Sequence, residues 1–296
     1  YFKFSFLKNK TLIVGASGSF GSELLKLYKK KNCMYTYNKN YLKKGIKFNV
    51  IKDKIEKKIS SLAKIKDGYI LFAEKNPNLC FKNKKYSNLL NVHAAKKILN
   101  IFKRFNIKPI FLSTDLVFSG VKGKYVEKDT PKPKTLYGKQ KLIIEKYIKK
   151  NFQNYLIFRL SKTYSFKKND SFTNWIKFFE KKDEVFCASD QIYNPIFISD
   201  AAKIVYKISK KNLNGIFNLA GFKSYSRYEI MKKLYKEYSK VKNKKIKLVK
   251  CKFNSLGKNY ENWPLNTSMN MSKVKKSINY KPMNLTKAIK NTIRAY

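Results

Sequence analysis

The chain has 296 residues, 43% of them hydrophobic, which is enough to fill the core of one large α/β domain or of a nucleotide-binding domain with a smaller lobe. No run approaches the roughly 18–20 uncharged apolar residues of a membrane span, and the opening YFKFSFLKNK is too short and too Lys-rich for a signal peptide, so we expect a soluble protein. The formal net charge is +49, but Lys is spread along the whole chain and only four residues are Arg, so we expect compositional drift rather than a nucleic-acid surface.

The first half of the chain alternates hydrophobic strands with amphipathic helices, the pattern of βαβ units around a parallel sheet. In chain order we predict a strand at 11–16, a helix at about 20–31, strands at 33–37, 46–50 and 68–73, a helix at 79–105, a strand at 108–114, a helix at 136–149 and a strand at 155–160.

After residue 160 the alternation loosens. In chain order we predict a helix at 171–182, an extended segment at 192–198, a helix at 199–209, a strand at 215–221, a helix at 225–239, a strand at 244–251 and a terminal helix near 284–294. The order predicts an α/β fold, a Rossmann-type doubly wound parallel sheet with a smaller C-terminal substrate lobe. The dinucleotide-binding domain is placed at 1–165, with 193–222 crossing back to it, and the substrate-binding lobe at 166–192 and 223–296.

A glycine-rich turn, GASGSFG, joins the first strand to the first helix. Glycines permit a tight turn and let backbone N–H groups approach a pyrophosphate at the helix N-terminus, and the third glycine permits close packing of helix on strand. Glycines also mark ordinary turns, but this position after the first buried strand favours a dinucleotide site. The residues predicted to hold the pyrophosphate are Gly15, Ser17, Gly18, Ser19, Phe20 and Gly21.

The end of the second strand bears on the choice of cofactor. An Asp or Glu about 20 residues past the glycines would bind the ribose 2′-hydroxyl of NAD. The strand runs Tyr35-Thr36-Tyr37-Asn38-Lys39, without an acid, and Lys39 is placed to pair with a 2′-phosphate. Asn38 and Lys39 are therefore predicted cofactor contacts, and NADP(H) is favoured over NAD(H).

Tyr137 and Lys141 form a candidate catalytic pair. At i and i+4 of a helix their side chains share one face, and a nearby ammonium stabilises phenolate, which lowers the pKa of a Tyr and makes it a usable general acid. Y-x-x-x-K means little by itself in a chain so rich in both residues. Its value comes from its place after Ser113 and Thr114, at the C-terminal end of a strand where such sheets bind ligands. The hydroxyl of Thr114 would orient a substrate carbonyl, or would merely cap a turn.

The thiols and the one imidazole exclude other chemistries. The four cysteines are widely separated and form no C-x-x-C pair, which argues against a zinc site or a disulfide framework and fits a reducing cytoplasm. His93 is the only histidine, so a Ser-His-Asp relay or a His-rich metal centre is not expected. We predict no metal site, and we expect His93 to be a packed or half-exposed helix residue.

The order GASGSFG, then FLSTDLVFSG, then Y-x-E-x-D-x-P-x-P-x-x-x-YGKQK resembles the extended short-chain dehydrogenases, and their dTDP-4-dehydrorhamnose reductase branch in particular. Later segments match the same branch: Asn194-Pro195 followed by Ser199-Asp200-Ala201-Ala202, and the strand GIFNLAG at 215–221. The resemblance runs from about Thr11 to about Ala288.

The resemblance implies that the chain reduces the keto group of a nucleotide-activated 4-keto-6-deoxy sugar, a step of polysaccharide biosynthesis. Thr114, Tyr137 and Lys141 match the family's catalytic set, with Tyr137 as general acid, and Asn91 matches the asparagine that supports it. Further residues are implied at the cofactor (Ala73, Ser113, Tyr137, Lys141) and at the substrate (Asp115, Val117, Phe118, Trp263). The long helices at 79–105 and 136–149 would pair across a two-fold axis, which implies a homodimer.

Two segments depart from the family pattern and put the identity of the sugar in doubt. The family has Asn-x-Ala-Ala after its fourth strand, where this chain has Leu71-Phe72-Ala73-Glu74. Near the C-terminus the family has Arg-Pro-x-Asn, where this chain has Trp263-Pro264-Leu265-Asn266. Trp263 would either stack on a base or sugar or pack against the lobe.

Three other functions remain open. A nucleotide-sugar epimerase or dehydratase would use the same triad, although Asp115-Leu116 lacks the Asp-Glu pair expected of a dehydratase. A non-catalytic regulatory subunit would resemble the methionine adenosyltransferase β subunit, which keeps much of the cofactor site. A charge-driven nucleic-acid-binding protein would bind random duplex in a salt-sensitive way.

Overall fold

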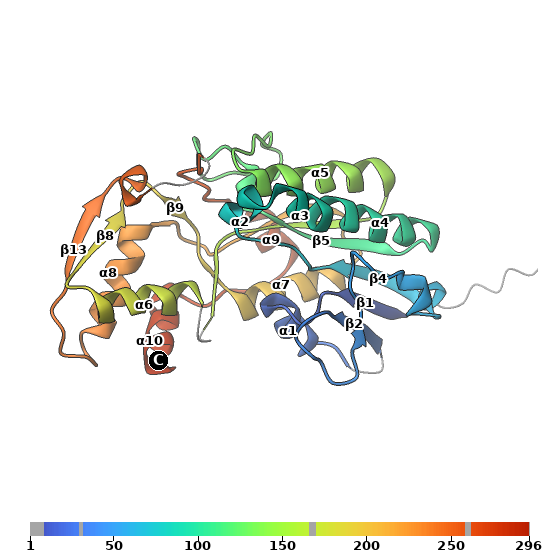
Figure 1. Ribbon diagram of the computed structural model, residues 1–296, viewed down its shortest axis with the longest axis horizontal. Coiled ribbons are helices and arrows are strands. Elements are labelled where there is room, and N and C mark those ends of the chain that lie inside the picture. Colours follow the sequence, from blue (N-terminus) through green and yellow to red (C-terminus); the bar gives the residue numbers. More distant parts are fainter. Residues whose placement is uncertain (1–8, 30–31, 166–169, 258–261, 296) are drawn as a thin grey trace, which may run out of the picture. The chain divides into compact units, whose positions relative to one another are not determined.

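The computed structural model describes residues 9–29, 32–165, 170–257 and 262–295. It divides into two compact units (Figure 1). The first unit comprises residues up to Ser113, Leu136–Phe158 and Val205–Phe217; the second comprises Thr114–Thr135, Arg159–Ile204 and Asn218 onward. The expected lobe segments 166–192 and 223–296 fall in the second unit. This unit also takes in 114–135, 159–165, 193–204 and 218–222, which we expected in the dinucleotide-binding domain or in the segment crossing back to it. That this unit binds a substrate stays a prediction.

Seven strands form one sheet in the order β11-β6-β5-β4-β1-β2-β3. Their bounds are β1 (Lys10–Val14), β2 (Cys33–Tyr37), β3 (Ile46–Lys47), β4 (Ile65–Ile70), β5 (Lys108–Thr114), β6 (Leu156–Leu160) and β11 (Gly215–Leu219). β1 pairs in parallel with both β2 and β4, so the strand order reverses beside β1, as in a doubly wound Rossmann sheet. The predicted fold class is confirmed, and the strands predicted at 33–37 and 108–114 are confirmed to the residue.

The first unit is built around the buried side chains of these strands. Leu12, Ile13 and Val14 of β1 are fully buried, as expected of a central parallel strand that is covered on both faces. In Figure 1, α4 (Ala95–Arg104) and α5 (Leu136–Asn151) lie on one face of the sheet, and α1 (Ser19–Leu25) lies on the other. α1 ends six residues before the expected Lys31, because Leu27 and Tyr28 donate to carbonyls three residues back and leave the α-helical ladder.

The helical stretch predicted at 79–105 is interrupted. It consists of α2 (Pro77–Lys82), α3 (Lys84–Asn88), a π-helical turn (Leu89–Ala94) and α4. Asn76 caps α2 by accepting from the backbone N–H groups of Asn78 and Leu79, and the chain breaks at Asn83, whose ψ is +59°. π-helical turns recur at functional sites, and this one carries Asn91.

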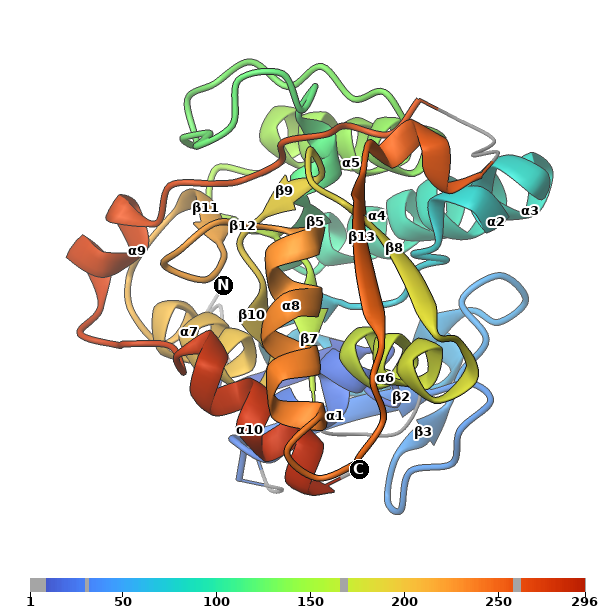
Figure 2. The same cartoon turned by 90° about the vertical axis from the view of Figure 1, so that its left-hand side faces the viewer.

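The second unit has its own hydrophobic core, which includes Phe172, Phe179, Ile230 and Leu234. Its helices are α6 (Ser171–Lys181), α7 (Ile198–Ser209, which continues into the first unit), α8 (Arg227–Tyr238), α9 (Ser272–Ser277) and α10 (Leu285–Ala295). Its short strands are β7 (Thr163–Tyr164), β8 (Glu184–Ala188), β9 (Ile192–Tyr193), β10 (Ile196–Phe197), β12 (Tyr225–Ser226) and β13 (Lys247–Cys251). α8 packs against α6 and α10 (Figure 2).

Two features of this unit differ from expectation. β8 was not predicted, yet it pairs in parallel with β13 over five residues. The extended segment expected at 192–198 is two short strands separated by Asn194 and Pro195, since a proline has no N–H to give to a ladder. In the part of the chain that the structure describes, no helix is both long and apolar enough to cross a membrane.

Candidate functional site

The glycine turn after β1 has the geometry that its first and third glycines predict. Gly15 has a φ of +88°, and a Cβ there would lie 3.0 Å from the backbone nitrogen of Phe72. A Cβ on Gly21 would lie 2.6 Å from the carbonyl oxygen of Ala16, so only glycine permits this approach of α1 to the end of β1. The predicted role of the third glycine in close packing is confirmed.

The middle of the turn is open. Gly18 is the N-cap of α1, and the nearest atom to a Cβ built on it is the Gly15 carbonyl oxygen at 3.7 Å. Gly18 and Ser19 are exposed, and Ser17 and Phe20 are half-buried. The backbone of Gly15 is fixed by β2, because its N–H donates to Thr36 Oγ1 at 3.1 Å. This arrangement fits a pyrophosphate, since it offers uncovered backbone donors at a helix N-terminus.

Asn38 and Lys39 follow directly after β2 and are exposed. Ala73 follows β4 and is half-buried. All three stand at C-terminal ends of strands that flank β1, the edge where open α/β sheets bind their ligands.

Asn91 ties the segment after β4 to helix α5. Its Oδ1 accepts from the Glu74 backbone N–H at 2.9 Å, and its Nδ2 donates to the Glu74 carbonyl at 3.0 Å and to Gln140 Oε1 at 2.7 Å. Gln140 is fully buried and donates in turn to Ser87 Oγ at 2.9 Å and Asn88 Oδ1 at 2.8 Å. Gln140 is the residue before Lys141, so this network holds the part of α5 that carries Lys141 against the π-helical turn.

Gln140 was not among the predicted site residues. A glutamine in so polar a stretch as YGKQK carries no burial signal, because its partners come from residues about 50 positions away. Only its spacing, three residues after Tyr137, could have indicated that Gln140 shares a helix face with that tyrosine.

Lys141 is buried within the first unit, with a relative exposure of 5%. Its ammonium donates to the Leu112 carbonyl of β5 at 2.8 Å and lies 4.5 Å from the ring centroid of Phe111 and 5.7 Å from that of Tyr137. Burial lowers the pKa of Lys141 to about 8, although the charges of Cys80 and Glu145 act in the opposite direction. The helix therefore places the ammonium beside the tyrosine, as the i, i+4 spacing predicts.

A stability measurement tests the burial of this charge. Between about pH 8 and pH 10.5 the unfolded chain binds a proton at Lys141 that the folded chain does not, so the free energy of unfolding rises with pH there. Relative to Lys141→Met, the wild type should gain on the order of 3 kcal/mol across this window. Urea unfolding of both proteins at pH 7, 8, 9 and 10 measures the difference; parallel pH curves would contradict it.

Ser113 is buried and donates from its Oγ to Glu145 of α5. Its hydroxyl hydrogen is thus used within the first unit, and its oxygen lone pairs could still accept from a cofactor.

The second unit begins with a hydrogen-bonded group around Asp115. Thr114 Oγ1 accepts from the Leu116 N–H at 3.2 Å, which caps the turn Asp115–Val117, and it donates to Asp115 Oδ1 at 3.1 Å. Thr267 Oγ1 donates to Asp115 Oδ2 at 2.7 Å. Burial raises the pKa of Asp115 to about 6, against the opposite effect of the bonds from Thr267 and Thr114 and of the charge of Lys162. Thr114 is thus a turn cap in this structure.

Val117 and Phe118 are fully buried. The ring of Phe118 stacks on Tyr125 with centroids 4.2 Å apart, and the guanidinium of Arg159 lies 4.9 Å from the Phe118 centroid. Both predicted substrate contacts therefore also form the core under the loop that follows β5, and their contact with a substrate stays a prediction.

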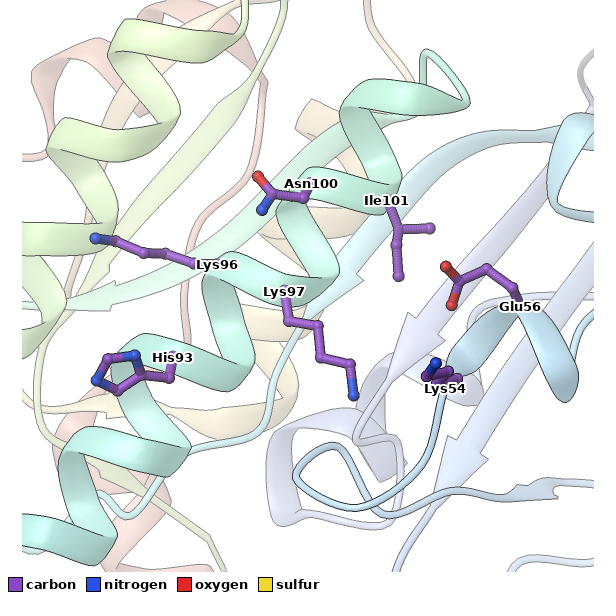
Figure 3. Close-up of a pocket in the computed structure, with 7 residues that line it drawn as sticks. All are labelled: Lys54, Glu56, His93, Lys96, Lys97, Asn100 and Ile101. Carbon is purple, nitrogen blue, oxygen red and sulfur yellow. The ribbon is translucent and has the colours of Figure 1, made fainter.

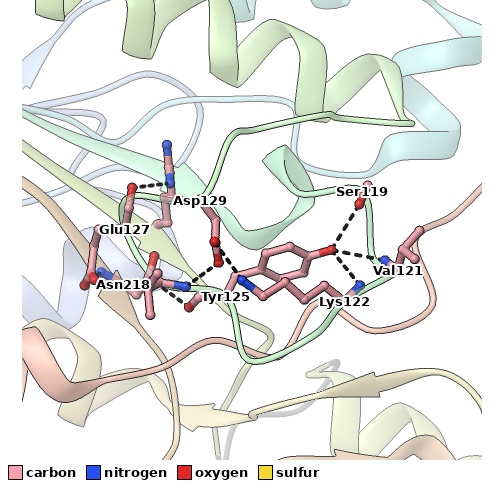
Figure 4. Close-up of polar contacts among 9 residues, drawn as sticks. Ser119, Val121, Lys122, Tyr125, Glu127, Asp129 and Asn218 are labelled. Carbon is pink, nitrogen blue, oxygen red and sulfur yellow. Dashed lines mark hydrogen bonds and ion pairs between the residues drawn. The ribbon is translucent and has the colours of Figure 1, made fainter.

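Tyr125 holds this loop in shape (Figure 4). Its hydroxyl accepts from the backbone N–H groups of Val121 and Lys122, both at 3.1 Å, and lies 3.0 Å from Ser119 Oγ. Burial alone would raise the pKa of Tyr125, but the bonds from Ser119, Lys122 and Val121 lower it below its ordinary value. Asn218 of β11 donates to the Tyr125 carbonyl at 2.9 Å and so fixes the loop to the strand.

The segment around Trp263 lies against the same loop. A Cβ on Gly120 would meet Pro264 Cβ at 2.3 Å, and one on Gly123 would meet the side chain of Asn266 at 2.3 Å. Trp263 is half-buried, and its ring centroid lies 6.1 Å from that of Phe253. The packing role of Trp263 is thus present, and its stacking on a ligand stays a prediction.

Two cavities lie within the first unit, and neither contains a predicted site residue. One of about 430 Å³ is lined from the π-helical turn, α4 and the segment 54–56 (Figure 3); its residues are Lys54, Glu56, His93, Lys96, Lys97, Asn100 and Ile101. The other, about 880 Å³, is lined in part by Lys66, Asp67 and Lys108. These belong to the N-terminal halves of β4 and β5, opposite the edge where such sheets bind dinucleotides.

His93 differs from expectation. It is exposed on the π-helical turn rather than packed or half-exposed, because its neighbours Asn91, Val92 and Ala94 take up the buried face. In the described ranges no three His, Cys, Asp or Glu side chains gather as a metal site would require.

Comparison with known proteins places the chain in a family. The family model described as the RmlD substrate binding domain matches residues 9–296. The dTDP-4-dehydrorhamnose reductase of Aggregatibacter actinomycetemcomitans is 26% identical over 215 residues, covering 70% of this chain and 73% of the relative. Methionine adenosyltransferase 2 subunit beta of Xenopus laevis is 24% identical over 234 residues, covering 75% and 70%.

A solved structure shows the same fold. The dTDP-4-dehydrorhamnose reductase of Bacillus anthracis in complex with NADP superposes with a TM-score of 0.79 at 19% identity, covering 98% of this chain and all of that one. Because the family model matches residues 9–296, the chain belongs to the RmlD substrate-binding-domain family of extended short-chain dehydrogenases.

Proposed function

We propose that this protein uses NAD(P)H to reduce the keto group of a nucleotide-activated 4-keto-6-deoxy sugar. The observation that carries the proposal is the pair on α5. Lys141 is fixed to the Leu112 carbonyl, two residues before Thr114, and lies beside the Tyr137 ring. Burial works against the charge of this ammonium, and a buried lysine with a lowered pKa beside a phenol is typical of sites of proton transfer.

The roles follow from the chemistry of each group. Tyr137 donates its proton to the carbonyl oxygen as negative charge develops there, and Lys141 stabilises the phenolate that remains. Thr114 orients the carbonyl oxygen through its hydroxyl, which must then give up its bond to Asp115. The bound nicotinamide supplies the hydride. Asn91 and Gln140 act through α5, since they touch neither reacting group and fix the helix that carries both.

The cofactor fits the glycine turn, where the open face of Gly18 and the fixed backbone of Gly15 would receive the pyrophosphate. NADP(H) is proposed over NAD(H) because β2 is followed by Asn38 and Lys39 and not by an acid.

Lys39→Glu tests this preference. The exposed Lys39 should pair with a 2′-phosphate, and a carboxylate there should repel it and accept from a 2′-hydroxyl instead. We expect the ratio of NADPH to NADH affinity to fall at least about tenfold, a difference typical of one charge-assisted contact. Fluorescence titration with both cofactors measures it, and Lys43→Glu, in the loop that follows, is the control. An unchanged ratio would make Lys39 ordinary surface charge.

The direct experiment is NADPH oxidation with a panel of 4-keto-6-deoxy nucleotide sugars. Turnover with one member supports the reductase and identifies the sugar. Tight NADPH binding without turnover on any member counts against it.

A regulatory subunit is the second candidate, because the chain is also similar to the β subunit of methionine adenosyltransferase 2. If the chain is a regulatory subunit, a pull-down should recover a tightly bound protein partner, and no sugar of the panel should be reduced. An epimerase or dehydratase would instead convert nucleotide sugars without net NADPH consumption.

We further propose a cytoplasmic homodimer. None of the four cysteines, all of which lie in the described part of the chain, forms a disulfide, in keeping with a reducing compartment, and α4 and α5 would supply the dimer faces. Sedimentation at micromolar concentration tests the oligomeric state.

A further inference from the structure

Three buried hydrogen-bond donors of the second unit have no partner among the described residues: Ser161 Oγ, Tyr193 Oη and Arg227 Nε. The last two, Tyr193 and Arg227, belong to neighbouring segments, β9 and the start of α8. Tyr193 is 94% buried, with a relative exposure of 6%. A buried donor that is left unpaired destabilises a fold, so native proteins keep few of them, and those that persist commonly serve a ligand or an ordered water. Neither residue has a role in the mechanism above.

The backbone brings the two residues into one region. β9, which ends at Tyr193, pairs antiparallel with β12, with Tyr225 opposite Tyr193. β12 runs directly into α8, whose first residue is Arg227, and the Arg227 N–H donates to the Gln191 carbonyl at 2.9 Å. The labels β9, β12 and α8 can be followed in Figure 2. The guanidinium of Arg227 lies 5.5 Å from the ring centroid of Trp175, which restricts its orientation.

The pKa of the Tyr193 phenol depends on its burial, on the charge of Arg227 and on that of Asp115, near the start of the second unit. Burial raises the pKa of Tyr193 well above its ordinary value, with the charge of Arg227 lowering it and that of Asp115 raising it. The phenol is therefore neutral and keeps its proton to donate. Asp115 accepts from Thr114 and Thr267, and it is not a hydrogen-bond partner of the Tyr193 phenol among the described residues.

We propose that Tyr193 and Arg227 form a subsite that donates hydrogen bonds to the diphosphate of the nucleotide-activated substrate. This rests on the proposed function. Both atoms are donors, so the missing partner supplies acceptor oxygens, and phosphate oxygens are the strongest acceptors such a substrate carries. A guanidinium ordered on an aromatic ring suits phosphate geometry. The positive charges of Arg227 and Lys162 oppose the negative charge of Asp115, which by itself would repel an anion.

The test is Tyr193→Phe, which removes one oxygen and leaves the ring in place. Calorimetry would measure binding of dTDP, UDP, thymidine and NADPH by the full chain. We expect the Kd for the two diphosphates to rise about tenfold, with thymidine and NADPH binding unchanged. The melting temperature should not fall, because the phenol has no partner to lose. Tyr225→Phe, on the paired strand, is the matched control and should bind all four as the wild type does.

Arg227→Lys gives an independent reading, since it keeps the charge and removes Nε. The same selective loss for diphosphates is expected. Unchanged diphosphate binding by Tyr193→Phe, or an equal loss for thymidine, would each overturn the subsite. So would a clear fall in the melting temperature, which would show a structural phenol. Failure of the wild type to bind any nucleoside diphosphate while binding NADPH would instead overturn the proposed function, and the subsite with it.

Discussion

Replacing Tyr137 by Phe is expected to lower kcat by about 10²–10⁴-fold, the contribution of a positioned general acid, while NADPH binds as before. The change removes only the phenolic oxygen of a residue that is 8% exposed, and Lys141 stays on the Leu112 carbonyl. Steady-state NADPH oxidation with the active member of the sugar panel measures kcat, and fluorescence titration measures cofactor affinity.

The same helix offers a matched control. Tyr147 lies on α5, six residues after Lys141, and its hydroxyl bonds to Asn100 of α4. Tyr147→Phe should keep wild-type turnover. If Tyr137→Phe kept it too, the assignment of the acid would be wrong. If both variants lost activity together with helicity, the effect would lie in the packing of α5.

Gly21→Ala is expected to destabilise the fold by about 1–3 kcal/mol or more, the usual cost of forcing one carbon into a packed interior. Its Cβ would lie 2.6 Å from the Ala16 carbonyl oxygen, and both atoms belong to backbone that cannot turn away. α1 would have to move off the end of β1, which opens the turn that holds the pyrophosphate. The midpoint of urea unfolding measures the loss.

Gly18→Ala separates the two roles of the turn. Its Cβ would have 3.7 Å of space, at a φ of −70° that alanine adopts freely, so the apo protein should keep its stability. NADPH affinity should nevertheless fall, because the added methyl group stands on the open side of the turn. Equal stability losses in both variants would contradict the packing argument, and unchanged NADPH affinity of Gly18→Ala would contradict the site.

The sequence carries little information about the polar contacts of α5. Tyr137 and Lys141 could be named because their spacing is local and a helix fixes it. Asn91 could be named only through the resemblance, and Gln140 not at all, since their partners depend on how α5 packs against the π-helical turn. The break at Asn83 was also not predicted, because the stretch Lys82–Lys85 around it contains neither a glycine nor a proline.

By itself the sequence determined the parallel sheet, the order of its main elements, the glycine turn and the Tyr-Lys spacing. These depend on hydrophobic periodicity and on backbone conformation within a few residues. Tertiary structure alone decided that β8 pairs with β13, that Thr267 holds Asp115, and that Tyr193 Oη and Arg227 Nε have no hydrogen-bond partner among the described residues. Such contacts join residues tens to hundreds of positions apart, and their free energy comes from burial, which no local pattern records.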